Sequence, residues 1–522
     1  MSQMLKSSGA MAAATLTSRV LGMVREIVYS DFMGVDWVAG AFQFAFMIPN
    51  LFRRLLGEGA LTASFIPIFK EKEKMGTEAE MWRAANAVIS GLLVAAGVLV
   101  ALATIGITLA LAVGYHSEQT TLMLRLVRVM FPYMLLVCLA AIFMGILNAR
   151  GHFFIPALGT VIMNLVLIAS VYLLAPHMGL FLKEKIFALA IGVLVAGLAQ
   201  AFFQLPSLRA EGFRYQWVAP WGEPTVQRVV RQMIPGTIGV AAFQLNVVMT
   251  QGIAFWIDPP IVASFNYAVR LMELPQGVFG ISLATFLLPL LSGLAAEKKY
   301  DEFRESLRHG LDHLIFINLL ASVLLVVLAE PIVRLLFEHG KFGPIATQSV
   351  SLALACLAPG LILFSMNNIV ARAFYALGDT RTPMKISVFC LVLNLIFAAA
   401  LVKAFRQGGL GLANTLSAAV NLILLTYSLR RKMGKLGLAS LRKTCLQTGG
   451  AVSVAGLAAW GIGLGCLRYF GHVGLVPRLL DVFAPMTVAA ILYWLITWKL
   501  KVASAAEVGG LLLKRLGRRG KA

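Results

Sequence analysis

Long apolar segments recur along the whole chain and are separated by short polar connections. A helix that spans a membrane needs about 20 predominantly apolar residues, and this rule predicts about fourteen spanning helices here. They lie near residues 9–30, 38–56, 86–113, 122–148, 156–175, 186–206, 232–257, 262–291, 311–337, 346–375, 384–402, 410–429, 446–467 and 482–500. The apolar stretch 59–69 is interrupted by Gly59 and Pro67, so we expect it to extend the second helix or to pack at the interface. The pattern predicts an all-α polytopic membrane protein.

The apolar pattern contains an internal repeat. Three positions recur at a constant spacing of 227 residues: Pro132 and Pro359, Gly151 and Gly378, and Pro156 and Pro383. The segment ALTASFIPIF is similarly echoed by LATFLLPLL, 222 residues later. We therefore predict two six-helix lobes of the same orientation, residues 1–210 and 225–432. Two additional helices within 440–500 and a basic tail, 501–522, follow them. Substrate sites in transporters built from repeats usually lie between the halves.

Composition and charge support a membrane location. The 522 residues are 59% hydrophobic and 13% charged, whereas soluble proteins carry about 25% charged residues. The net charge is +21, and the basic residues are concentrated in alternate connections between apolar segments. Such connections face the cytoplasm, which predicts two cytoplasmic termini. We expect anionic membrane lipids as partners of the basic loops and tail, and no nucleic acid.

Charged side chains interrupt the first two predicted helices. They are Arg19, Arg25, Glu26, Arg53, Arg54 and Glu58. A cation at the centre of a bilayer costs at least about 2.5–3.5 kcal/mol, so such residues usually face a protein interior or a water-filled cavity. Guanidinium groups match phosphate oxygens well, and the surplus of arginine predicts a cationic cavity for a phosphorylated substrate. The simpler alternative is that these arginines mark helix ends and reach lipid headgroups.

Spacing along the helices predicts which polar residues share a face. Asn50 lies three positions before Arg53, so we expect Arg53 to point inward on the side of Asn50. Arg54 then snorkels or pairs with Glu58, about one turn further. In the second half, Arg270 and Glu273 are also three positions apart and share a face. Arg270 either contributes to the cavity or forms a self-neutralising local ion pair with Glu273.

The motifs of common enzymes are absent from the sequence. It contains no Walker A loop, HExxH motif or GxSxG elbow, and its five cysteines are scattered singly within apolar segments. We therefore expect a transporter rather than an enzyme, without a metal or an organic cofactor. Without a nucleotide site, ion gradients, membrane potential or consumption of the product must supply the free energy for transport.

Four stretches carry a resemblance to a known family: SRVLGMVRE, PNLFRRLLGEGALTASFIPIF, RLMELPQGVFGISLATFLLPLLS and GDTRTPMKI. With them the chain resembles the MurJ (MviN) family of lipid II flippases, in the superfamily of multidrug and polysaccharide exporters. The resemblance implies fourteen helices, a cationic cavity, a groove for the undecaprenyl tail at the last two helices, and a bacterial inner-membrane location. It implies flipping of lipid II for peptidoglycan synthesis, with sodium, proton or membrane-potential coupling. We expect a monomer that cooperates with the cell-wall synthesis machinery.

Site residues follow from the resemblance position by position. The cavity arginines of the family correspond to Arg19, Arg25, Arg53 and Arg270. Further polar positions at the cavity or its gates correspond to Asn50, Glu58 and Glu273, and we group Ser18 and Arg54 with them. The chain departs from the family at Gly40 and Val269, where some members have acids. Alternative functions are export of another polyprenyl-linked glycan, drug–ion antiport, or an enzyme that acts on the same lipid.

Overall fold

The computed structural model describes residues 2–55, 61–114, 116–434 and 438–507, and these form helices without any strand. Twelve helices within these ranges are long and apolar enough to cross a membrane. They correspond in order to the third to fourteenth predicted segments. The first two predicted segments correspond to α1 (Ser2–Met33) and α2 (Trp37–Phe52), which are outside the twelve. The all-α polytopic fold is confirmed, and the predicted number of fourteen helices is approximate.

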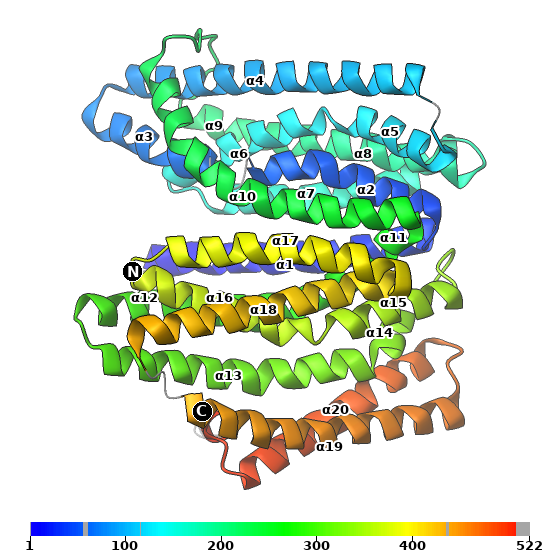
Figure 1. The fold of residues 1–522 in the computed structure, drawn as a ribbon. Helices are drawn as coiled ribbons and strands as arrows, with labels where there is room; N and C mark the ends of the chain where they lie inside the picture. The colour runs from blue at the N-terminus through cyan, green and yellow to red at the C-terminus, as the bar shows by residue number, and fades with distance from the viewer. Residues whose placement is uncertain (1, 56–60, 115, 435–437, 508–522) are drawn as a thin grey trace. The chain divides into compact units, whose positions relative to one another are not determined.

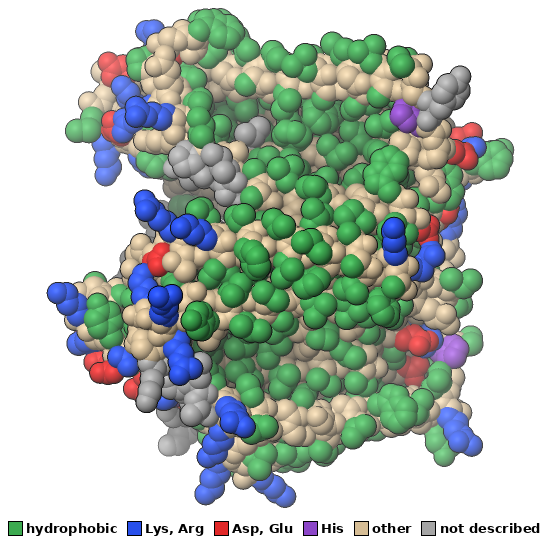
Figure 2. Space-filling model, in the orientation of Figure 1, with side chains coloured by type: hydrophobic (Ala, Val, Ile, Leu, Met, Phe, Trp, Pro, Cys, Tyr) green, Lys and Arg blue, Asp and Glu red, His purple; other side chains and the backbone are tan. Residues whose placement is uncertain are grey.

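The chain divides into two compact units. Unit 1 is Met1–Ala263 with His339–Phe342, and unit 2 is Ser264–Glu338 with Gly343–Ala522. The lobe boundaries near 210 and 225 were predicted from the sequence repeat and stay a prediction. On the face drawn in Figure 2, hydrophobic side chains cover the helices along their length, whereas Lys and Arg gather at the helix ends. This is the distribution expected of helices that cross a bilayer.

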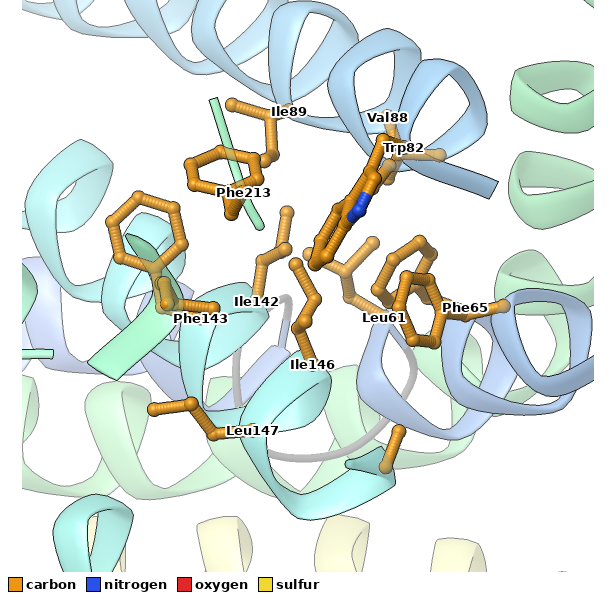
Figure 3. Packing of buried hydrophobic residues seen from close by; sticks show 14 of the residues in the cluster. Leu61, Phe65, Trp82, Val88, Ile89, Ile142, Phe143, Ile146, Leu147 and Phe213 are labelled. Atoms are coloured by element: carbon orange, nitrogen blue, oxygen red, sulfur yellow. The ribbon is translucent and has the colours of Figure 1, made fainter. Parts of the chain in front are cut away.

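Unit 1 consists of α1, α2 and the helices up to α10, all visible in Figure 1. The further elements are α3 (Thr62–Met75), α4 (Glu78–Val113), α5 (Glu118–Met130), α6 (Tyr133–Ala149), α7 (Phe154–Ala169), η2 (Ser170–Leu174), η3 (Ala175–His177), α8 (Leu182–Phe202), α9 (Leu205–Ala210) and α10 (Pro224–Ile257). A capping box of Thr77 and Glu80 fixes the start of α4. An aromatic and aliphatic core joins α3, α4 and α6, and Phe213 and Trp82 lie within it (Figure 3).

Unit 2 holds most of α11 (Pro259–Pro275) and all later helices. These are η4 (Gln276–Ile281), α12 (Ser282–Ala296), α13 (Tyr300–Val327), α14 (Ala329–Phe337), α15 (Pro344–Leu357), α16 (Gly360–Ala376), α17 (Arg381–Phe405), α18 (Gln407–Met433), α19 (Leu438–Phe470) and α20 (Leu475–Lys499). Its core is built from α12, α13, α16 and the end of α18. The last two helices, α19 and α20, pack side by side (Figure 1).

One predicted segment differs from the structure, and another is described only in part. The ninth predicted helix, 311–337, is in fact two helices, since α13 begins at Tyr300 and ends at Val327, and α14 follows as a separate helix. In the interrupted stretch 59–69, residues 59 and 60 lie outside the described residues, and from Thr62 the chain forms α3, which continues to Met75 and contains Pro67. Helix α3 packs with α4 and α6, and the expectation that the stretch extends the second helix or packs at the interface stays a prediction.

The repeat is visible in the backbone itself. The fourth predicted helix is broken at Pro132, the N-cap of α6, and the tenth is broken at Pro359, the N-cap of α16. Both broken helices end in the same turn. Gly151 and Gly378 have φ of +88° and +74°, and a left-handed residue after a helix is the mark of a Schellman C-cap. Glycine adopts this conformation without the steric cost of a Cβ, which explains the glycine at both positions.

Candidate functional site

Arg25 is a cation held inside unit 1. Its guanidinium donates from Nη1 to Oδ1 of Asn164 on α7 at 3.0 Å, and Nη2 forms an ion pair with Glu26. The guanidinium carbon lies 5.7 Å from the centre of the Tyr29 ring, a cation–π contact. The Arg25 and Glu26 side chains are 11% and 10% exposed. Neutralisation by Glu26 makes the burial of this arginine possible.

Asn164 is the residue that positions Arg25 and that the predicted site omits. Its amide nitrogen donates to the carbonyl oxygens of Ser18 at 3.3 Å and Thr160 at 3.0 Å, and its side-chain oxygen accepts from Arg25. The Asn164 amide therefore links α7 to α1 at two positions, the Ser18 carbonyl and the Arg25 side chain. An asparagine in an apolar helix is a recognisable signal of an interhelical hydrogen bond, but sequence spacing does not identify its partner. Arg19, in contrast, is exposed on α1, and Ser18 is half-buried.

The end of α2 carries the second group of arginines. Asn50 accepts a hydrogen bond at 2.6 Å from Nε of Arg53, so the contact that their spacing predicts is present. Arg54 donates from Nη1 to Oε1 of Gln244 on α10 at 3.5 Å. Residues 53–55 are π-helical and follow Pro49 inside α2. A wider π-helical turn here moves the two adjacent arginines away from ideal α-helical directions. Glu58, the partner considered for Arg54, lies outside the described residues.

Arg270 in unit 2 forms the local ion pair considered as an alternative. Its Nη1 lies 2.8 Å from Oε2 of Glu273, and the two side chains are 41% and 46% exposed. Pairs that are this accessible contribute about 0–1 kcal/mol. A second anion could therefore replace Glu273 as the partner of Arg270 at a small cost in free energy. A π-helical segment, η4, follows α11 directly, as π-helical residues also accompany Arg53 and Arg54 in unit 1.

Gly40 explains one departure from the family pattern. A Cβ placed on Gly40 would lie 2.1 Å from the carbonyl oxygen of Pro259. Any side chain at this position therefore requires a backbone shift, and an acid cannot occupy it in this structure. Val269, the other departure, is half-buried and directly precedes Arg270.

Comparison with known proteins identifies the family of this arginine-bearing helical fold. A family model described as lipid II flippase MurJ matches residues 29–509. The chain belongs to the MurJ family. It is 31% identical to a probable lipid II flippase MurJ of Vibrio cholerae over 501 residues, covering 91% of this chain and 94% of that protein. It is 32% identical to the lipid II flippase MurJ of Burkholderia cenocepacia over 493 residues, covering 92% and 93%.

Solved structures place the MurJ-family chain in a wider fold group. A lipid II flippase MurJ in an inward closed conformation matches with a TM-score of 0.75 at 23% identity, covering 94% of this chain and 99% of that one. An inward-facing multidrug resistance transporter of the MATE family matches with a TM-score of 0.61 at 16% identity, covering 83% and 99%. At these identities the likeness concerns the fold alone, so the residues of the site must carry the chemistry.

Proposed function

We propose that the protein is a lipid II flippase that moves undecaprenyl-pyrophosphate-linked disaccharide-pentapeptide from the cytoplasmic to the periplasmic leaflet by alternating access. The match to the MurJ family over residues 29–509 supports this proposal most strongly. Curated relatives with this activity in their names share about a third of their residues across more than nine-tenths of the chain. The transport would supply precursor for cell-wall synthesis, and the alternatives of another glycan or a drug are not favoured.

The chemistry of the arginines fits such a substrate. A pyrophosphate carries charge on oxygens that guanidinium groups bind in a bidentate manner. In our proposal Arg19, Arg25, Arg53 and Arg270 bind it, while Asn50 and Asn164 orient Arg53 and Arg25 through the hydrogen bonds described above. Ser18, Arg54, Glu58 and Glu273 would tune or gate binding. Glu26 and Glu273 already occupy two of the arginines, so the substrate would displace or share these carboxylates.

The setting of the protein is part of the same proposal. We place it in the bacterial inner membrane as a monomer, with both termini in the cytoplasm and basic loops against anionic lipids. It requires no bound cofactor, and a sodium or proton gradient or the membrane potential drives it. Cell-wall synthesis enzymes are the expected partners, and nucleic acid is not.

Depletion of the protein in its host, followed by measurement of lipid II accessible at the outer face, tests the function. We expect outer-face lipid II to fall and wild type to restore it. Arg25→Ala, Arg53→Ala and Arg270→Ala should insert normally and fail to restore it. Arg128→Ala, which removes an exposed arginine on α5, is the matched control and should restore it fully. Unchanged outer-face lipid II on depletion, with no second flippase present, would contradict the function; full activity of all three site variants would contradict the site.

A further inference from the structure

Asp481 on α20 is a buried acid that the proposed transport site does not use. The residue is 3% exposed. Both carboxyl oxygens are buried, and neither forms a hydrogen bond with any residue that the structure describes. An ionised carboxylate with no donor is among the most costly groups to bury, and such a group usually neutralises instead. The carboxyl therefore needs either a cation or a proton.

The nearby cations already have other anionic partners. Arg334 on α14 forms ion pairs with Glu330 and, through Nε at 3.6 Å, with Glu338. Arg478, one turn before Asp481, contacts Oε1 of Glu338 at 3.3 Å. It also donates to the Glu338 carbonyl oxygen at 2.9 Å and the His472 carbonyl oxygen at 3.2 Å. Two guanidinium charges thus meet two glutamate charges, and an ionised Asp481 would add a negative charge without a counterpart.

Other titratable groups around Asp481 come from three elements. Arg334 on α14, His472 in the turn before α20 and Cys466 on α19 lie close enough to Asp481 to interact with it electrostatically. His472 is exposed. A solvent-exposed side chain of the α19–α20 turn therefore lies near the buried carboxyl.

We propose that Asp481 is a proton-binding site of the C-terminal helix pair, and that loss of its proton loosens the contact between α20 and α14. With the proton bound, the charges of Arg334, Arg478, Glu330 and Glu338 balance. When the proton leaves, the new carboxylate competes with Glu338 for the guanidinium groups that join α20 to α14. The contact of α20 with α14 then depends on the pH on the side of the membrane where the α19–α20 turn lies. This inference rests on unit 2 alone and not on the proposed function.

Infrared spectroscopy of the purified full-length protein in lipid nanodiscs tests the proton directly. Wild type at neutral pH should show the C=O stretch of a protonated carboxylic acid, and this band should shift when the aspartates carry ¹³C in the side-chain carboxyl. The band should be lost in Asp481→Asn, which imitates the protonated form. Asp301→Asn is the control, because Asp301 is solvated, with a side chain 96% exposed, and it should leave the band unchanged. Absence of a label-sensitive band in wild type would overturn the proposal even if the Asn variant failed to fold.

Hydrogen exchange tests the structural consequence. In wild type, intrinsic-rate-corrected exchange of α14 and of the first turns of α20 should rise as the pH is raised, because ionisation leaves a charge unmatched. Asp481→Asn should remove this rise, whereas Asp301→Asn should retain it. The same pH dependence in wild type and Asp481→Asn would overturn the link between the proton and the helix contact.

Discussion

Two turns 227 residues apart have the same backbone and different chemistry. In residues 147–152, the amides of Gly151 and His152 donate to the carbonyl oxygens of Asn148 and Leu147 at 3.1 and 2.9 Å. In residues 374–379, Gly378 and Asp379 donate to Tyr375 and Phe374 at 3.0 and 2.9 Å. The residues before the two glycines, Arg150 and Leu377, share φ of −84°. The repeat therefore preserved the hydrogen bonds of the turn and left its side chains free to diverge.

The first turn is held by a network of charges. Arg150 contacts Oε1 of Glu73 at 2.7 Å and Oε2 of Glu211 at 3.0 Å, and its guanidinium lies 5.8 Å from the centre of the Trp82 ring. His152 contacts the other oxygen of Glu211 at 2.7 Å. Hydrogen bonds from Lys70 and Arg150 hold the pKa of Glu73 below its ordinary value. Hydrogen bonds from His152 and Arg150 likewise hold the pKa of Glu211 below its ordinary value. This network joins α3, the turn and the end of α9.

Within the part of the chain that the structure describes, the second turn has a single ionic link. Asp379 accepts from Nζ of Lys432 at the end of α18 at 2.7 Å, and from the Thr382 amide at 3.0 Å. These hydrogen bonds, from Lys432 first and then Thr382, lower the pKa of Asp379 to about 2. Leu377 occupies the position of Arg150, so no cation bridges several carboxylates there. One scaffold thus tolerates a network of five ionic residues in unit 1 and a single pair in unit 2.

The largest effect should come from giving the first turn the side chain of the second. Arg150→Leu leaves Glu73 and Glu211 without the cation they share, and its side chain is 23% exposed. Because hydrogen bonds to charged groups contribute about 1.5–3 kcal/mol, we expect a loss of about 2–3 kcal/mol. Thermal unfolding of the detergent-solubilised protein, monitored by tryptophan fluorescence, measures it. Arg209→Leu, at an exposed position on α9, is the control; equal losses in the two variants would show that the network contributes nothing specific.

Replacement of either turn glycine should lower stability less than Arg150→Leu does, and by the same amount at both positions. A Cβ at Gly151 or Gly378 would meet no atom within 4 Å, so Gly→Ala acts only through the positive φ. That conformation costs about 1–2 kcal/mol for a residue with a Cβ. Gly151→Ala and Gly378→Ala should therefore lower stability alike in the same unfolding assay. Gly159→Ala, inside α7 with open space around it, should be neutral or stabilising; a large difference between the two turn variants would contradict their equivalence.

How far the sequence predicts these features depends on the range of the interaction. Apolar periodicity located the helices near 122–148 and 346–375, and the constant spacing of Pro and Gly marked them as related, because these are local properties of the chain. The breaks at Pro132 and Pro359 within these two segments were not predicted. The contact of Arg53 with Asn50 followed from helical spacing. Asn164 beside Arg25, and Gln244 beside Arg54, could not be predicted, since they come from helices far along the chain. The close approach of Pro259 to Gly40 belongs to the same class.

The smallest effect should be at the isolated pair of the second turn. Lys432 is 42% exposed at the side chain, and accessible pairs contribute about 0–1 kcal/mol, so Lys432→Ala should cost at most that much at neutral pH.

The sign of the pH dependence follows from the lowered pKa of Asp379. A carboxyl whose pKa is lower in the folded than in the unfolded protein stabilises the fold at every pH above its ordinary pKa, which is 3.8 for Asp379. This stabilisation disappears as the pH falls to about 2. In Lys432→Ala the pKa of Asp379 should rise towards its ordinary value, so the difference in stability between wild type and variant should shrink across this pH range. Lys403→Ala, at another exposed lysine of unit 2, should show no such convergence. A constant difference between wild type and Lys432→Ala from neutral pH down to 2 would mean that the lysine stabilises the turn through packing rather than charge.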